Sequence, residues 1–85
     1  MRGLFNKVRN QVTRQRYVVS TIRKGENLFE TAVFAATILY IPKSLSKPEI
    51  TVETHTKDEA WEVHYQLTAR LLKEYPPRLF QEFSP

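Results

Sequence analysis

Apolar residues near the N-terminus recur at the spacing of a helix. When residues 4–24 are placed at about 100° per residue, six of their apolar side chains fall within roughly a third of the circumference. These side chains are Leu4, Phe5, Val8, Val12, Val19 and Ile22. Basic residues flank this arc on both sides, where long side chains cover apolar surface while their charges reach water. The pattern predicts a basic amphipathic helical arm over residues 1–24.

A second apolar stretch, residues 25–45, carries few charges. Twelve uncharged residues separate Glu30 from Lys43, fewer than the roughly twenty that cross a bilayer, which favours a buried soluble helix. The flanks favour a membrane span, because the charges lie near the ends and Tyr40 lies where interfacial aromatics occur. We expect a hydrophobic helix that spans a membrane once, with the buried soluble helix as the alternative. The side chains expected in the bilayer are Leu28, Phe29, Val33, Phe34, Ile38, Leu39, Tyr40 and Ile41.

The segment that follows is punctuated by proline. Pro42 ends the second helix, since proline removes a backbone donor and clashes with the preceding turn. In residues 46–56, Ile50 and Val52 alternate with polar residues as in a strand. No second strand is expected to pair with them, so we predict an extended linker that lies against a partner or forms a loop.

Thr56 and Glu59 fit a capping box, which predicts that a helix begins near residue 57. Over residues 57–75 the apolar side chains occupy one half of this amphipathic helix, and the charged ones occupy the other half. Two prolines end it, and residues 76–85 form an aromatic tail too short to fold alone. The helix is expected to pack against a partner protein or against the N-terminal helix, and the tail either anchors in a partner or is a frayed terminus. The expected contacts are Trp61, His64, Leu67, Leu71, Leu72, Tyr75, Leu79, Phe80 and Phe83.

Together these elements predict a mostly α-helical, extended and non-globular chain. A chain of 85 residues buries only a little over half of its unfolded surface, so a core of its own is marginal. The absence of cysteine removes disulfides and thiolate metal sites as sources of stability. We therefore expect the chain to depend on a larger assembly.

The net charge of +4 is unevenly distributed along the chain. Residues 1–24 hold seven basic residues and no acid, and the remainder is acidic overall. Such a segment favours polyanions such as anionic phospholipid or nucleic acid. The residues expected to contact them are Arg2, Lys7, Arg9, Arg14, Arg16, Arg23 and Lys24.

The sequence lacks the residue combinations of an active site. His55 and His64 match no metal-ligand spacing, and His64 lies on the apolar half of the predicted helix, as a hydrogen-bonded core or interface histidine would. The only glycines, Gly3 and Gly25, cannot form a phosphate-binding loop. We therefore expect no enzymatic activity, no cofactor and no metal site.

The order of these parts resembles that of the small single-span accessory subunits of mitochondrial respiratory-chain complexes. The shared layout is a basic arm, a short hydrophobic helix ending in Tyr40-Ile41-Pro42-Lys43, and a mixed-charge helix with an aromatic tail. The resemblance implies a non-catalytic subunit that stabilises a complex of the electron-transport chain or the ATP synthase, with other subunits and anionic phospholipid as partners. It places the chain in the mitochondrial inner membrane. The positive-inside bias then puts the N-terminus in the matrix and the C-terminus in the intermembrane space.

Two other functions fit the same sequence. The chain is alternatively a soluble ribosomal or mitoribosomal protein in which residues 2–24 neutralise RNA phosphates. That segment offers only Phe5 and Tyr17 for base stacking. The sequence is also consistent with a peripheral adaptor that lies on a membrane by its first helix alone.

Overall fold

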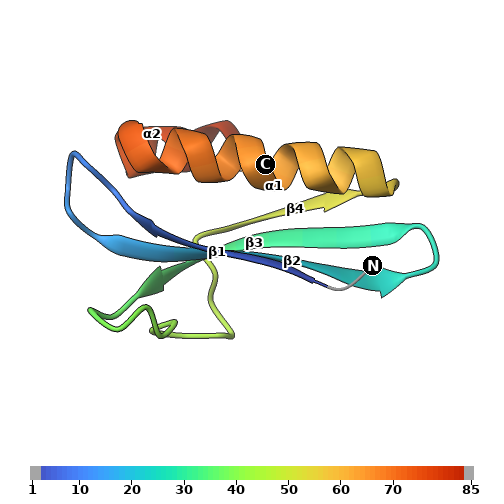
Figure 1. The fold of residues 1–85 in the computed structure, drawn as a ribbon, viewed down its shortest axis with the longest axis horizontal. Coiled ribbons are helices and arrows are strands. Elements are labelled where there is room, and N and C mark those ends of the chain that lie inside the picture. The colour runs from blue at the N-terminus through green and yellow to red at the C-terminus, as the bar shows by residue number, and fades with distance from the viewer. Residues whose placement is uncertain (1–2, 84–85) are drawn as a thin grey trace.

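The chain folds into an antiparallel sheet with two helices on one of its faces (Figure 1). The computed structural model describes residues 3–83. Strand order in the sheet is β1-β2-β3-β4, and each strand is antiparallel to its neighbours. The elements are β1 (Leu4–Arg9), β2 (Arg16–Gly25), β3 (Leu28–Ala36), β4 (Ile50–Thr54), α1 (Lys57–Lys73) and α2 (Pro76–Phe83).

This architecture corrects the expected fold class, because the chain is neither mostly helical nor extended. Its radius of gyration is 12.1 Å, close to the roughly 12 Å of a compact domain of this length. Elements that were expected to need a partner pack on one another instead. A four-stranded sheet packed against two helices buries apolar surface in one core, which separate helices would not do.

The helical arm expected over residues 1–24 is wrong, since this segment forms β1, a turn and β2. Along β2 the side chains alternate between the two faces of the sheet, so that Tyr17 and Val19 lie under the helices and Val18 lies on the opposite face. Most residues from 18 to 22 are β-branched, a type that favours strands over helices. The apolar residues of the expected arc are therefore divided between both faces.

The membrane span expected over residues 25–45 is also wrong. Its first part is β3, which lies between β2 and β4 in the sheet. Both faces of β3 are covered, with Val33 on one and Ala32 on the other. A strand buried on both faces gives the same continuous apolar run as a hydrophobic helix. Among residues 3–83 no helix is long and apolar enough to cross a membrane. This finding contradicts the expected single-pass inner-membrane topology.

The C-terminal half is closer to its expected form. Residues 46–56 contain β4, and the pairing strand that the sequence did not reveal is β3. The helix begins at Lys57 and ends at Lys73, and the Thr56 hydroxyl accepts from the Glu59 N–H at 3.1 Å. The expected tail forms α2, which begins at Pro76, a favoured residue for the first turn.

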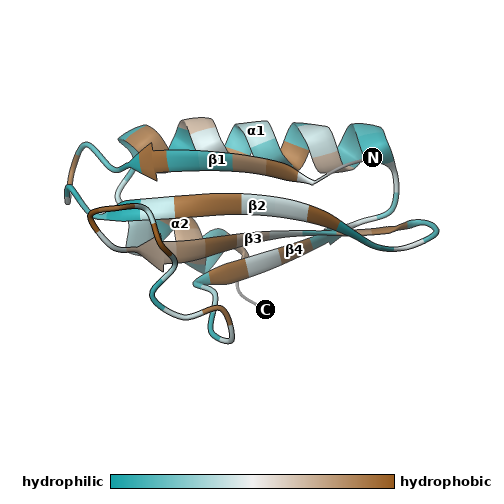
Figure 2. Ribbon diagram, turned by 60° about the horizontal axis from the view of Figure 1, so that its bottom comes forward, coloured by the Kyte–Doolittle hydropathy of each residue, from teal (hydrophilic) through white to brown (hydrophobic). Residues whose placement is uncertain are grey.

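The hydrophobic core lies between the helices and the sheet. Figure 2 shows the hydropathy of each residue, with apolar residues along β2, β3 and β4. The strands contribute Val8, Tyr17, Val19, Val33 and Ile50, and the helices contribute Leu67, Leu71 and Leu79.

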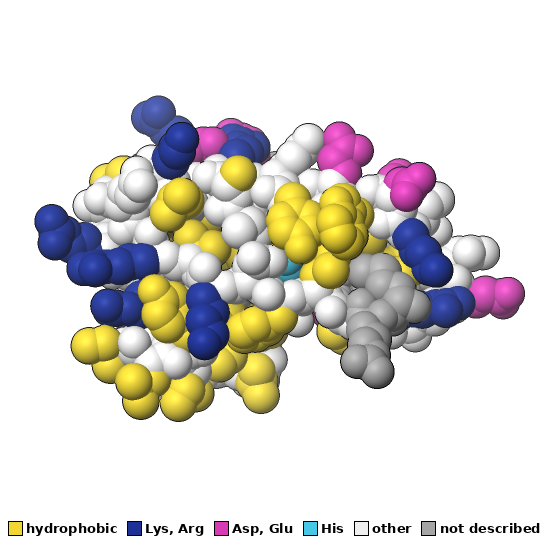
Figure 3. Space-filling model, in the orientation of Figure 1, with side chains coloured by type: hydrophobic (Ala, Val, Ile, Leu, Met, Phe, Trp, Pro, Cys, Tyr) yellow, Lys and Arg dark blue, Asp and Glu magenta, His cyan; other side chains and the backbone are white. Residues whose placement is uncertain are grey.

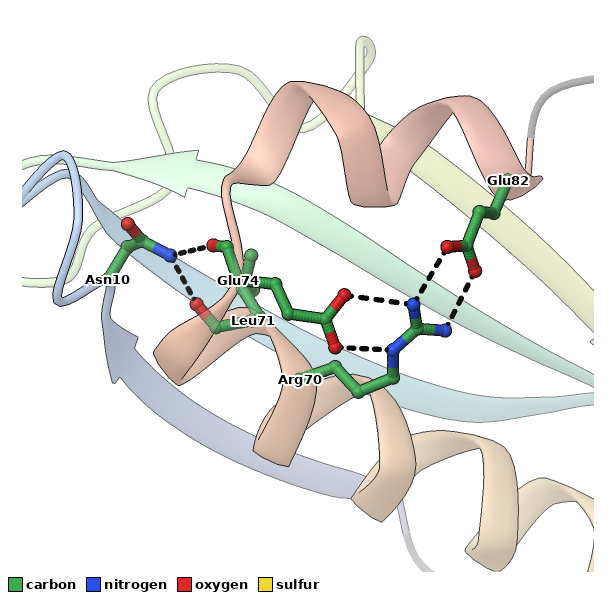
Figure 4. Close-up of polar contacts among 5 residues, drawn as sticks. All are labelled: Asn10, Arg70, Leu71, Glu74 and Glu82. Atoms are coloured by element: carbon green, nitrogen blue, oxygen red, sulfur yellow. Dashed lines mark hydrogen bonds and ion pairs between the residues drawn. The ribbon is translucent and has the colours of Figure 1, made fainter.

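Arg70 joins α2 to α1: its Nε donates to Glu74 at 2.7 Å and its Nη1 donates to Glu82 at 2.8 Å (Figure 4). The helices therefore cover one face of the sheet as a unit.

Candidate functional site

The opposite face of the sheet, named here the helix-free face, carries no helix. Side chains alternate along each strand, so every second residue of β1 and β2 lies on it. The residues on it are Phe5, Lys7 and Arg9 of β1, and Arg16, Val18, Ser20 and Ile22 of β2. This face and the loop between β3 and β4 form the candidate site.

The apolar loop, defined as residues 37–47, begins with a tight turn. The Thr37 N–H donates to the Ile41 carbonyl at 2.9 Å, and the Thr37 carbonyl accepts from the Tyr40 N–H at 2.9 Å. The Thr37 hydroxyl also accepts from the Ile41 N–H at 3.3 Å. Tyr40 takes a φ of 60°, in the left-handed region that closes such turns. The side chains around the turn are therefore held in place by backbone bonds.

Four aliphatic side chains of this loop are largely exposed to solvent. Their exposed fractions are 72% for Ile38, 72% for Leu39, 57% for Ile41 and 76% for Leu45. Single exposed apolar residues are ordinary, whereas a group of them close together is a candidate interaction site. Figure 3 shows apolar side chains gathered at one end of the molecule, with basic side chains beside them.

The basic residues nearest to this loop come from β1, β2 and the loop itself. Arg9 and Arg16 lie directly opposite each other in the β1–β2 pairing. The Arg16 guanidinium is 5.6 Å from the centre of the Tyr40 ring, which brings the loop beside the arginine pair. Lys43 lies in the loop, and its Nζ donates to Gln15 at 3.5 Å. The basic-apolar face is defined as Ile38, Leu39, Ile41 and Leu45 together with Arg9, Arg16 and Lys43.

This face has no acidic side chain of its own. No aspartate or glutamate occurs in residues 1–25 or 31–48. Among the described residues, none of the ion pairs includes Arg9, Arg16 or Lys43. Like charges directly opposite on neighbouring strands repel each other. Among the described residues the Arg9–Arg16 pair therefore has no carboxylate that neutralises its charge.

The structure divides the residues expected to bind polyanions into two groups. Lys7, Arg9 and Arg16 share the helix-free face, and Arg14 lies in the turn next to them with a φ of 66°. The other group lies at the far end of β2. There Arg23 donates to the Gly25 and Glu26 carbonyls, and Lys24 pairs with Glu30 at 3.1 Å. Arg2 is outside the described residues.

The residues expected in the bilayer are also divided. Phe29 and Val33 are buried in the sheet, and Leu28 and Phe34 are half-buried. The others belong to the apolar loop, where Tyr40 lies over the helix-free face and the aliphatic members are exposed; these members are Ile38, Leu39 and Ile41. The residues expected to share one membrane span are thus divided between the sheet and the apolar loop.

Most residues expected to contact a partner protein serve the chain's own core. Leu67, Leu71, Leu79 and His64 are fully or almost fully buried there. Leu72, Phe80 and Phe83 are half-buried and pack against this core. Only Trp61 and Tyr75 are well exposed.

His64 is the centre of a buried polar chain. Its Nδ1 lies 2.8 Å from the Thr21 hydroxyl, which lies 2.6 Å from the Thr31 hydroxyl, and its Nε2 lies 2.7 Å from Asn6 Oδ1. A neutral imidazole fits this chain when Nε2 donates to Asn6 and Nδ1 accepts from Thr21. Burial lowers the pKa of His64. The arrangement satisfies buried polar groups, as expected for a core histidine.

A separate open hollow of about 530 Å³ lies between the β2–β3 hairpin and the start of α1. Its charged lining mixes both signs, with Arg23 and Lys57 beside Glu26 and Asp58. Residues 3–83 contain no group of three His, Cys, Asp or Glu side chains placed to hold a metal ion. This hollow lacks the single sign of charge found on the basic-apolar face.

Leu45 and the Arg9–Arg16 pairing were missed by sequence reasoning. The pairing depends on strand register, which a helical interpretation cannot produce. Leu45 lies between serines and prolines in a segment taken as the end of a span, and its exposure follows only from the fold.

No family model, curated protein or solved structure matches this chain.

Proposed function

We propose that this protein is a non-catalytic module that docks on anionic membrane surfaces through its basic-apolar face. One observation carries the proposal: exposed aliphatic side chains on a hydrogen-bonded turn lie beside two arginines that no carboxylate of the described residues neutralises. Aliphatic groups enter the boundary between headgroups and acyl chains, and cations bind lipid phosphates and carboxylates. Both parts of the surface therefore serve the same ligand.

The expected strength is that of a reversible peripheral contact. Each basic residue near an anionic leaflet contributes about 1 kcal/mol. A large aliphatic side chain contributes about 1.5–3 kcal/mol when fully buried, and less when it enters only the interface. The sum for this face is several kcal/mol, which gives reversible docking. A role as an accessory subunit of a larger complex stays a prediction.

RNA is a less suitable ligand for this face. Single-stranded RNA is bound by basic grooves with aromatic side chains that stack on bases. Here the prominent side chains are aliphatic, and the Tyr40 ring already lies near Lys7 and Arg16. The RNA alternative nevertheless makes a distinct prediction and is included in the test.

Co-sedimentation with lipid vesicles tests the proposal. We expect binding to vesicles of phosphatidylcholine with phosphatidylserine, little binding to phosphatidylcholine alone, and weaker binding as salt is added. The double variant Ile38→Ser/Leu39→Ser should lose at least about tenfold in affinity, because it removes the two apolar groups at the turn. Tyr75→Ser is the matched control, since it removes an exposed apolar side chain between α1 and α2, outside the basic-apolar face.

Two results would overturn the proposal. One is full vesicle binding by the double variant with an unchanged unfolding transition. The other is salt-dependent binding of single-stranded RNA that is tighter than vesicle binding and unaffected by the double variant. The second result would favour the RNA alternative.

A further inference from the structure

Among residues 3–83 no strand pairs with the outer edge of β1, and the hydrogen-bonding groups of this edge can be assigned. The Asn10 N–H donates to the Gln15 carbonyl at 2.9 Å, just beyond the end of β1. In an antiparallel pair, hydrogen-bonded and non-hydrogen-bonded positions alternate. The even-numbered residues of β1 therefore bond to β2. It follows that the N–H and C=O groups of Phe5, Lys7 and Arg9 point away from the sheet.

One side of α1 lies over this edge. His64 contacts Asn6 of β1, and the Leu72 carbonyl accepts from the Gln11 N–H at 2.8 Å, so the helix runs alongside the strand. Trp61 and Tyr65 lie eleven and seven residues before Leu72, about three and two helical turns, and so share its side of α1. They form an aromatic pair with ring centres 4.8 Å apart. Trp61 is 57% exposed and Tyr65 is 39% exposed. An added strand would therefore meet aromatic rings on its helix side.

The other side of the same edge is basic. Lys7 and Arg9 lie on the helix-free face, with exposed Phe5 next to them. Because side chains of a strand alternate between faces, an added strand would meet cations with every second residue and aromatic rings with the residues between. The two sides of the edge therefore select different residue types.

We infer that the β1 edge binds an extended peptide in which acidic residues alternate with apolar residues. The peptide adds a fifth strand to the sheet. Its acidic side chains lie beside Lys7, its apolar side chains cover Trp61 and Tyr65, and its backbone bonds to Phe5, Lys7 and Arg9. Strand addition to an open sheet edge is a common mode of peptide recognition, in which main-chain bonds give affinity and alternate side chains give specificity.

A second copy of this chain is a poorer occupant. A two-fold pairing of one β1 with another would place the Lys7 and Arg9 side chains of both copies on the same face. Like charges that lie opposite one another destabilise such a pair. An acidic peptide instead provides the complementary charge.

The inference is tested with a blocked synthetic peptide of about six residues in which glutamate and valine alternate, long enough to cover β1. Trp61 is the only tryptophan of the chain and reports on the site directly. We expect its emission to shift to shorter wavelength on binding. A peptide of the same composition with its glutamates in one block should bind at least about tenfold more weakly, because its side chains cannot match both faces.

Backbone methylation identifies the binding mode. Only one alternate set of peptide N–H groups can face β1, so N-methylation of that set should abolish binding, whereas methylation of the other set should not. On the protein, Lys7→Pro removes an outward-pointing donor at an edge, where proline is tolerated. It should weaken binding more than Lys7→Gln, which removes only the charge.

The outcomes that would overturn the inference are specific. They are equal binding by both methylated peptides, Trp61 emission that does not respond to the peptide, and dimerisation through β1 without peptide binding. Ile38→Ser/Leu39→Ser should retain the peptide, since the apolar loop is not part of this edge. Failure of vesicle docking and failure of peptide binding are thus independent results.

Discussion

Asn10, in the turn after β1, donates from its side-chain amide to the carbonyl of Leu71 at 2.6 Å, near the C-terminal end of α1 (Figure 4). The same amide donates to the Glu74 carbonyl at 2.7 Å. Its side-chain oxygen accepts from the N–H groups of Val12 and Thr13. The last carbonyls of a helix lack partners within the helix. One fully buried side chain therefore both shapes the β1–β2 turn and joins it to the helix layer.

Replacement of Asn10 should strongly destabilise the fold. Asn10→Ala leaves buried carbonyls and turn N–H groups without partners, each at a cost of about 1–3 kcal/mol. We expect a loss of about 3 kcal/mol in the free energy of unfolding, measured by urea denaturation. Asn10→Asp should not rescue stability, because a carboxylate cannot donate to the two carbonyls. Asn27→Ala, at the exposed β2–β3 turn, is the control. A loss below about 1 kcal/mol for Asn10→Ala would contradict this role.

His64 should make the protein less stable in mild acid. Burial lowers its pKa from the ordinary value of 6.5, so the unfolded state binds the proton more readily than the folded state. The contribution of the neutral side chain is complete above pH about 6.5 and falls as the pH drops below that value, by at most about 1.4 kcal/mol per pH unit.

Denaturation at a series of pH values measures this slope. His64→Gln should reduce the loss of stability between pH about 6.5 and 5 even though its overall stability is lower. His55→Gln, at an exposed position, should retain the loss. An unchanged slope in His64→Gln would assign the acid sensitivity to another group.

Arg70 should control the attachment of α2. Its hydrogen bonds lower the pKa of Glu74 and of Glu82, so the contact is present above pH about 4.5 and is lost as the pH falls below that value. Arg70→Gln should release α2, with faster hydrogen exchange in residues 76–83 and little change in β2. Lys73→Gln removes a nearby exposed cation and is the control. Equal exchange in both variants would show that the apolar contacts of Leu79 suffice.

The sequence predicted α1 because the signals that form it are local. The capping box at Thr56 and the apolar spacing lie within the helix itself, so no distant partner is needed to identify it. Here the structure follows the pattern from Lys57 to Lys73.

The strands could not be identified in the same way. The apolar residues of β1 and β2 fit a helical arc as well as a sheet, and the choice depends on pairing with β3 and on cover from α1. β3 is buried on both faces and so lacks the alternation that would have identified it. Secondary structure in this half of the chain is decided by tertiary packing.

Only the residue types of the candidate site were predictable from the sequence, and their arrangement was not. Basic residues and the apolar segment are visible in the sequence, but strand register brings Arg9 opposite Arg16, and the Thr37 turn brings Tyr40 over them. Arg23 and Lys24 belong to the same basic segment, yet β2 carries them to its far end. Charge composition predicted an anionic ligand, whereas the position of the basic-apolar face could be derived only from the fold.

The Arg9–Arg16 pair should reveal a trade-off between stability and docking. Two guanidinium groups opposite each other on neighbouring strands repel, so Arg9→Gln should raise the free energy of unfolding by about 0.5 kcal/mol. The same change removes a cation from the basic-apolar face and should weaken binding to phosphatidylserine vesicles about fivefold, as expected for about 1 kcal/mol per basic residue. Arg78→Gln removes one charge from an exposed position of α2 and should alter neither property. Urea denaturation and co-sedimentation of the same preparations measure both effects. A gain in the free energy of unfolding together with weaker vesicle binding would show that the pair serves an external anion. A loss of stability in Arg9→Gln would instead mean that the arginine serves the fold.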